Sequence, residues 1–117
     1  MDFDRFTFGL YLRPAEMPAL DEERAASIQD DHLAYLAGLG RAGQLLVAGP
    51  FEDQDDPTLR GVMIFSTGVG EARSLLLEDP AVRAGVLVFK LMSWLAPAGL
   101  VSFHAGRFPE SMEEATT

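Results

Sequence analysis

His32 and Asp79 are the two residues whose types and positions best suit acid–base chemistry. His32 shares the apolar stripe of a helix-like segment with Ile28 and Tyr35, so we expect its imidazole to point inward. Asp79 precedes Pro80 at the end of a second helix-like segment. A carboxylate that fixes the tautomer of an imidazole leaves the other ring nitrogen free to act as a base. The same residues equally suit a core histidine and a helix-ending aspartate, and both interpretations stay open.

Four further residues are expected to line a pocket near this pair: Gly49, Pro50, Tyr11 and Ser93. Gly49 and Pro50 end a short apolar segment, where their backbone can border a pocket or simply turn the chain. Tyr11 and Ser93 lie on strand-like segments. Ser93 would act as a nucleophile only with His32 within hydrogen-bond reach.

The residue types favour neither a metal nor a cofactor. The chain has no cysteine, and its only other histidine is His104, so a zinc site is poorly supported. Asp30 and Asp31 adjoin His32, but neighbouring helix positions point about 100° apart, which predicts a solvated acidic face. Gly68-Val69-Gly70 lacks the lysine and the glycine spacing of a phosphate loop. Without a flavin, nicotinamide or haem motif, proton transfer leading to elimination or isomerisation suits the chain better than redox chemistry.

The bulk composition limits the partners. A chain of 117 residues with 48% hydrophobic content predicts one domain with its own core. The formal charge of −9 argues against nucleic acid and against anionic membrane surfaces. No apolar stretch approaches the roughly 18 residues of a membrane span. The first residues lack the basic and apolar regions of a signal peptide, so we expect a cytoplasmic location.

The hydrophobic pattern alternates between strand and helix periods in the order βαββαβ. This order predicts an α+β, ferredoxin-like fold, with a four-stranded antiparallel sheet and both helices on one face. We expect a domain over residues 1–96 and a partly disordered extension over 97–117 that frays from residue 110. The predicted strands are residues 3–12, 44–51, 60–66 and 85–95. The predicted helices are residues 21–43 and 71–78, and Pro80 is expected to end the second helix. An acidic loop is predicted over residues 52–59.

The last predicted strand is apolar on both sides. Phe89 and Leu91 point one way and Val88 and Met92 the other, with Lys90 as the interruption. Two helices cover only one face of such a sheet, and an exposed apolar face of this size normally marks an interface. The pattern therefore predicts a homodimer in which two sheets pack face to face.

The sequence also resembles a known family along most of its length, from Phe6 to Trp94. The resemblance is to the YCII-related family of the dimeric α/β-barrel superfamily. It implies a ferredoxin-like protomer that dimerises through its sheet, and a His–Asp pair that lines a pocket, here His32 and Asp79. Relatives are linked to small-molecule reactions such as dehydrochlorination of a hydroxyquinone. The matching residues are His32-Leu33, Gly43, Leu45-Leu46, Ala48-Gly49-Pro50, Gly61, Glu71-Ala72, Asp79-Pro80 and Ala84-Gly85-Val86.

Two functions follow as hypotheses. The first is a small lyase-like enzyme without a cofactor, which acts on a small organic molecule by proton transfer through His32 and Asp79. The second is a non-catalytic ligand-binding or regulatory dimer, in which the same two residues form a polar clamp or a structural hydrogen bond. The chain departs from the family in an acidic segment at 27–31 and in a longer tail after Leu95, which we expect to affect the surroundings of His32 and the pocket mouth.

Overall fold

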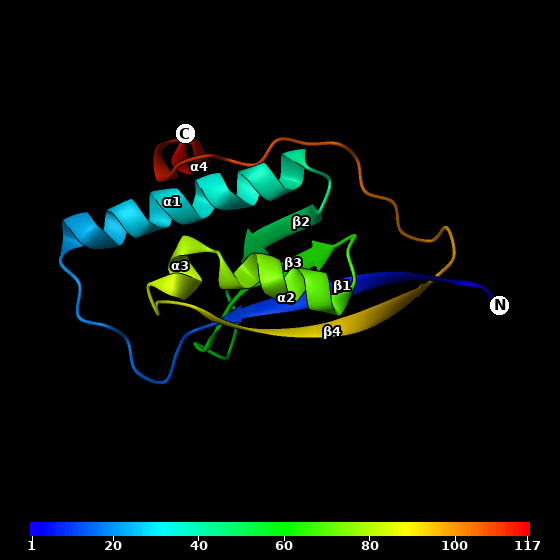
Figure 1. Cartoon of the computed structure of the whole chain (residues 1–117), viewed down its shortest axis with the longest axis horizontal. Helices are drawn as coiled ribbons and strands as arrows, with labels where there is room; N and C mark the ends of the chain where they lie inside the picture. The colour runs from blue at the N-terminus through cyan, green and yellow to red at the C-terminus, as the bar shows by residue number, and fades with distance from the viewer.

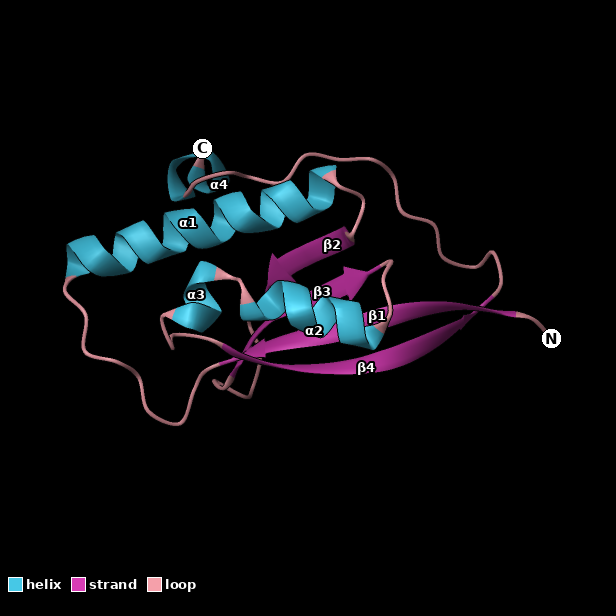
Figure 2. Cartoon of the chain, viewed as in Figure 1, coloured by secondary structure: helices cyan, strands magenta, loops and turns pink.

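The computed structural model describes all 117 residues, and its strands form one antiparallel sheet with helices packed on one side (Figure 1, Figure 2). The elements in chain order are β1 (Phe3–Leu12), α1 (Glu22–Arg41), β2 (Leu45–Pro50), β3 (Leu59–Phe65), α2 (Val69–Leu77), α3 (Pro80–Arg83), β4 (Val88–Pro97) and α4 (Met112–Thr116). The strand order in the sheet is β2-β3-β1-β4, so the first strand lies at its centre. This is the ferredoxin-like α+β arrangement, and that prediction is confirmed.

Helix α1 begins where the sequence supplies a cap. The carboxylate of Asp21 accepts a hydrogen bond from the Arg24 amide at 2.7 Å, and two glutamates follow in the first turn, where the helix dipole favours acids. Ile28, His32, Leu36 and Leu39 are buried along one stripe. The helix therefore holds the imidazole of His32 toward the interior, as the spacing of its apolar residues predicts. No helix of the structure is long and apolar enough to cross a membrane.

The central strand β1 defines the two faces of the sheet. Thr7, Gly9 and Tyr11 are buried on the face that carries the helices, while the residues between them point the other way. Cross-strand partners share a face, so Tyr11 lies between Gly61 on β3 and Phe89 on β4. Because Gly61 has no side chain, Tyr11 has a bulky neighbour in this row on only one side.

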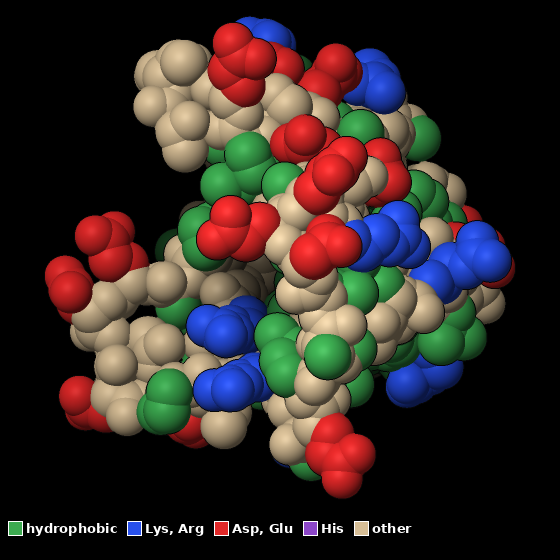
Figure 3. Space-filling view, turned by 90° about the vertical axis from the view of Figure 1, so that its left-hand side faces the viewer, with side chains coloured by type: hydrophobic (Ala, Val, Ile, Leu, Met, Phe, Trp, Pro, Cys, Tyr) green, Lys and Arg blue, Asp and Glu red, His purple; other side chains and the backbone are tan.

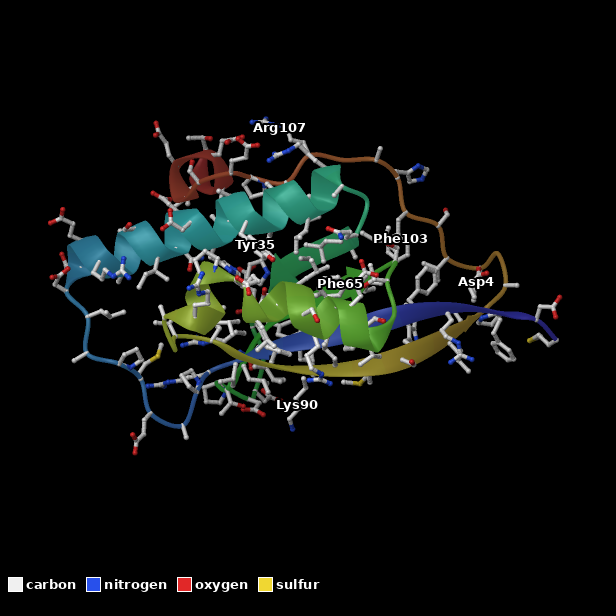
Figure 4. The ribbon with its side chains drawn as sticks, viewed as in Figure 1. Asp4, Tyr35, Phe65, Lys90, Phe103 and Arg107 are labelled. Carbon is white, nitrogen blue, oxygen red and sulfur yellow. The ribbon has the colours of Figure 1, made fainter.

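The hydrophobic core fills the space between this face and the helices. Phe65 and Met63 of β3, Leu45 of β2 and Leu76 of α2 are among its largest fully buried side chains. Figure 4 labels Phe65, the last residue of β3, next to α2 in this view. Packing of α1 and α2 on one sheet face thus fixes the positions from which His32 and Asp79 reach each other.

The opposite face of the sheet carries no helix, and we call it the open sheet face. Lys90 interrupts it and points away from the helices in Figure 4. Val88, Met92 and Val47 are each about two-fifths exposed there, at 43%, 41% and 39%. The cross-strand register places these side chains on the face: Phe6, Phe8, Leu10, Leu12, Val47, Val62, Ile64, Val88, Lys90, Met92 and Trp94.

The segment around Asp79 differs from the prediction. Helix α2 ends at Leu77, and Pro80 does not end it but opens a separate helix, α3. Proline suits the first position of a helix, because the amide it lacks would have no partner there. Gly85, at φ +78°, follows the end of α3, so β4 begins at Val88 and not at residue 85. Asp79 is therefore the residue that starts a helix.

The C-terminal tail, residues 98–117, runs back along the helical layer beside α1 (Figure 1). We expected its last residues to fray, but the structure has the short helix α4 there. Ser111 caps this helix by accepting a hydrogen bond from the Glu114 amide at 3.1 Å. Arg107 also forms an ion pair with Glu114, which ties the middle of the tail to this helix.

Contacts with α1 hold the tail in place. The ring of Phe108 packs directly over Gly40, where a side chain on the helix would collide with it. Arg41 forms an ion pair with Glu110, and the amide of Met112 donates to a carboxylate oxygen of Asp30 at 2.9 Å. The tail is thus anchored at several points along the outer surface of α1.

Candidate functional site

Two side chains from separate elements meet at the carboxylate of Asp79. The Nδ1 atom of His32, on α1, lies 2.9 Å from both carboxylate oxygens of Asp79, which precedes α3. The hydroxyl of Tyr11, on β1, donates to Oδ2 of Asp79 at 2.6 Å. The rings of Tyr11 and His32 also touch edge to face, with centroids 5.3 Å apart. His32 and Tyr11, which lie 47 and 68 residues before Asp79 in the sequence, thus form one hydrogen-bonded cluster with it.

The carboxylate of Asp79 is fully enclosed, with 0% of the residue exposed. Besides Tyr11 and His32, the amide of Ala81 donates to its Oδ1 at 3.0 Å, as the cap of α3. A carboxylate surrounded by donors accepts through both oxygens in its ionised form, which offers no proton in return. Nδ1 of His32 therefore carries the hydrogen of the shared bond. A buried charge is tolerated here because each oxygen has partners.

The second ring nitrogen of His32, Nε2, has no hydrogen-bond partner in the protein. The residue is 6% exposed, yet the only fully buried side-chain nitrogen or oxygen without a partner is Oγ1 of Thr67. Nε2 therefore keeps a small opening to the surroundings. An imidazole whose Nδ1–H is held by a carboxylate and whose Nε2 is free has the geometry of a general base or acid.

Of the two tyrosines of the chain, Tyr11 belongs to this cluster and Tyr35 lies beside it. Burial, followed by the negative charge of Asp79 and the hydrogen bond to it, raises the pKa of Tyr11 far above its usual range. Tyr35, one turn after His32 on α1, donates to the Leu75 carbonyl at 2.7 Å. Burial and the charges of Asp79 and Glu78 raise the pKa of Tyr35 as well. Figure 4 shows Tyr35 where α1 faces α2. Both hydroxyls are therefore hydrogen-bond donors at neutral pH.

The other residues expected at the pocket lie at different distances from the cluster. Pro50 shares a cross-strand row with Gly61 and Tyr11, two strands away, which is about 10 Å at the usual strand spacing. Gly49 precedes it at the end of β2. Ser93 faces Thr7, four residues from Tyr11 along β1, or about 13 Å. The fold brings Tyr11 to the pair, sets Gly49 and Pro50 on a nearby strand end, and places Ser93 toward the far end of the face.

Figure 3 views the end of the molecule at which α1 begins. Asp and Glu side chains are spread over this end, with Lys and Arg side chains and hydrophobic side chains between them. No group of three or more histidine, aspartate or glutamate side chains is arranged to hold a metal ion. A hollow of about 190 Å³ lies elsewhere, between the end of α1 and the tail, and Arg41, Arg107 and Phe108 are among its lining residues.

From its position in the sequence, Tyr11 is predicted only to line a pocket, and its hydrogen bond to Asp79 is not predicted. One signal was available, because Tyr11 falls on the side of β1 opposite to Phe6, Phe8 and Leu10. A tyrosine in phase with Thr7 and Gly9 faces the helices, and a buried hydroxyl needs a partner. The partner itself depends on how α3 is placed, which no local pattern in the sequence reveals.

Comparisons with known proteins agree with this architecture. No curated protein matches the chain. Among solved structures, the chain resembles the 5-chloro-2-hydroxyhydroquinone dehydrochlorinase TftG from Burkholderia phenoliruptrix AC1100, in complex with 2,5-dihydroxybenzoquinone. The two are 22% identical, with a TM-score of 0.52 over 75% of this chain and 92% of that one, a likeness of fold. The model of the YCII-related domain matches residues 7–95. With three quarters of its length matched and the ferredoxin-like fold in place, the chain belongs to the YCII-related family.

Proposed function

We propose that this protein is an acid–base enzyme that moves a proton on a small organic molecule, with His32 as the general acid or base and Asp79 as its orienting residue. One observation carries the proposal: Nδ1 of His32 is held by a buried carboxylate while Nε2 has no partner in the protein. This division of roles between the two ring nitrogens is what general base catalysis requires.

The reaction class that we propose is elimination or isomerisation next to a carbonyl or phenol group. In an elimination, Nε2 takes a proton from the substrate, the electrons of that bond form a new double bond, and the leaving group departs with its own electron pair. The imidazolium that results is stabilised by Asp79, 2.9 Å from Nδ1. The reaction named for TftG, a dehydrochlorination, belongs to this class and supports the proposal.

We also propose that two copies of the chain pack through the open sheet face. The accessible surface of 7513 Å² exceeds by about 1,300 Å² the value expected of a compact monomer of this mass. An ordinary specific interface buries roughly 800 Å² on each partner. A second copy placed on Val88, Met92 and Val47 would cover the apolar side chains of the open sheet face. Two sheets packed face to face are the arrangement that buries such a surface.

The experiment is a turnover screen with a matched set of variants. Chlorinated hydroquinones and related phenols are incubated with the protein, and product and released chloride are measured. His32→Gln and Asp79→Asn should lower kcat by about 10²–10⁴-fold, the range of general acid–base catalysis. His104→Gln is the matched control, because His104 is exposed on the tail and should leave turnover unchanged. Turnover that survives His32→Gln would contradict the proposed role.

A non-catalytic ligand-binding module is the second candidate, and one observation favours it. Asp79 caps α3 through the Ala81 amide, so its contacts with His32 and Tyr11 would also serve to fasten α3 to α1 and β1. Under this function, compounds from the same set would bind with measurable heat in calorimetry. The compounds would be recovered unchanged from the protein. His32→Gln would weaken their binding, and neither the wild type nor the variant would show turnover.

A further inference from the structure

We propose that Tyr11 is a positioning residue that sets the basicity of His32 through Asp79. The inference rests on the proposed function for its chemical meaning, and it assigns to Tyr11 a role beyond lining the site. Its hydroxyl donates to Oδ2 of Asp79 at 2.6 Å, and the same oxygen accepts from Nδ1 of His32 at 2.9 Å. The two donors therefore compete for the electron density of one oxygen.

This competition is expected to lower the basicity of His32. A carboxylate that gives part of its charge to a short bond with Tyr11 attracts the Nδ1 proton of His32 less strongly. The imidazolium is then less stabilised, and Nε2 is a weaker base. Without the Tyr11 hydroxyl, Asp79 keeps the Ala81 amide on Oδ1 and directs more of its charge at His32. Nε2 should then hold its proton to a higher pH.

Tyr11 is suited to this role because it stays a donor. It is 5% exposed, and burial together with the adjacent charge raises its pKa above any working pH, so the phenol does not ionise. It cannot itself serve as the base. The edge-to-face contact of its ring with His32 also limits how far the imidazole can turn.

The other titratable groups near His32 come from separate parts of the fold. Tyr11 approaches from β1, Asp79 from the residue before α3, and Tyr35 from α1 itself. Glu78, just after α2, adds its charge beside Tyr35 and is on the exposed surface. Of these, only Tyr11 shares an oxygen of Asp79 with His32. The geometry therefore gives Tyr11, and not Tyr35, direct influence on His32.

The test is NMR titration of the His32 ring in Tyr11→Phe, with His104 as an internal reference. Phenylalanine keeps the ring contact and removes only the hydroxyl, so the His32 titration midpoint should rise by about half a pH unit or more. Tyr35→Phe is the matched control, because its hydroxyl bonds to the Leu75 carbonyl, and the midpoint should stay where it is. An unchanged midpoint in Tyr11→Phe, whatever happens to its stability, would overturn the inference.

A second measurement covers the case in which Tyr11→Phe fails to fold. The chain has two tyrosines, so fluorotyrosine incorporated into the Tyr35→Phe protein labels Tyr11 alone. Fluorination makes the phenol a stronger donor, and the His32 midpoint should then fall. A midpoint that rises or does not move would count against the proposed competition.

These readouts need no substrate, so they separate this inference from the proposed function. A shifted His32 midpoint in a protein that turns over no compound would support the role of Tyr11 and contradict the proposed enzymatic function. Turnover together with an unshifted midpoint would support the enzymatic function and contradict the role of Tyr11. If both hold, the acidic limb of the kcat/KM profile, where the base His32 loses its proton, should move to higher pH in Tyr11→Phe together with the NMR midpoint.

Discussion

Replacing Gly40 by alanine is expected to release the C-terminal tail from α1 while the rest of the fold stays intact. An added Cβ would lie 2.4 Å from two ring carbons of Phe108. Carbon atoms in contact are normally about 3.5–4 Å apart, so the ring must retreat by more than about 1 Å. Gly38→Ala is the matched control, because its nearest neighbour is the flexible tip of Arg41 at 3.7 Å.

The expected change in the free energy of unfolding of Gly40→Ala is the sum of two opposing effects. Phe108 is half-buried, so lifting its ring should remove about 1–2 kcal/mol of apolar burial. Alanine in place of glycine within a helix contributes up to about 1 kcal/mol in the other direction. The global free energy of unfolding should therefore change by about 1 kcal/mol or less in Gly40→Ala. Gly38→Ala receives only the stabilisation from replacing glycine by alanine within a helix, and it should raise Tm by a few degrees.

Hydrogen–deuterium exchange read by mass spectrometry distinguishes the two variants. The amide of Met112 donates to Asp30, and that of Ala115 donates to the Ser111 carbonyl within α4. Both should exchange faster in Gly40→Ala and at the wild-type rate in Gly38→Ala. Equal protection of the tail in the two variants would show that Phe108 is not what holds it, and the reasoning would be refuted.

The remaining predictions concern the pair, the sheet face, the acidic loop and alkaline pH. Asp79→Asn removes the negative charge beside His32, so the His32 midpoint measured by NMR should fall by about a unit or more; an unchanged midpoint would show that the two are not partners. Val88→Asp on the open sheet face should give monomer or aggregate in light scattering, and a wild-type monomer at micromolar concentration would contradict the dimer. Amides at 53–56 should exchange fast, since none of them donates to the backbone, and strong protection there would be unexpected. The raised pKa of Tyr11 gives stability that is fully present below about pH 10, where the tyrosine of the unfolded chain ionises, and that is lost as the pH rises further. Urea unfolding from pH 8 to 11 should show a shallower alkaline decline in Tyr11→Phe than in wild type.

Local patterns in the sequence were sufficient for most of the sheet and for α1. The alternation of β1 predicts Phe3–Leu12, and those are its bounds in the structure. Asp21 and the acids after it place the start of α1, because capping depends on neighbouring residues only. The apolar stripe also predicts that His32 points inward, where it is found 6% exposed.

The elements that sequence reasoning missed depend on tertiary contacts. Helix α3 is four residues long, too short for a periodic pattern, and Asp79-Pro80 reads equally as the end of one helix or the start of another. Helix α4 lies on a tail whose composition is that of a fraying end, and it is held by Phe108 over Gly40. The bond between Tyr11 and Asp79 needs both the register of β1 and the position of α3, which only the assembled fold defines.

The strand order has a consequence for how the chain comes to be folded during synthesis. β1 is made first, yet its partner β4 pairs Phe3 with Pro97, at the other end of the domain. Until β4 leaves the ribosome, one edge of the central strand stays open, and such edges attract other strands. Contacts this distant in sequence also slow folding relative to helical bundles. Because Tyr11 lies on β1 and its partner Asp79 lies just before β4, the site cannot be assembled until the chain has been made through Asp79.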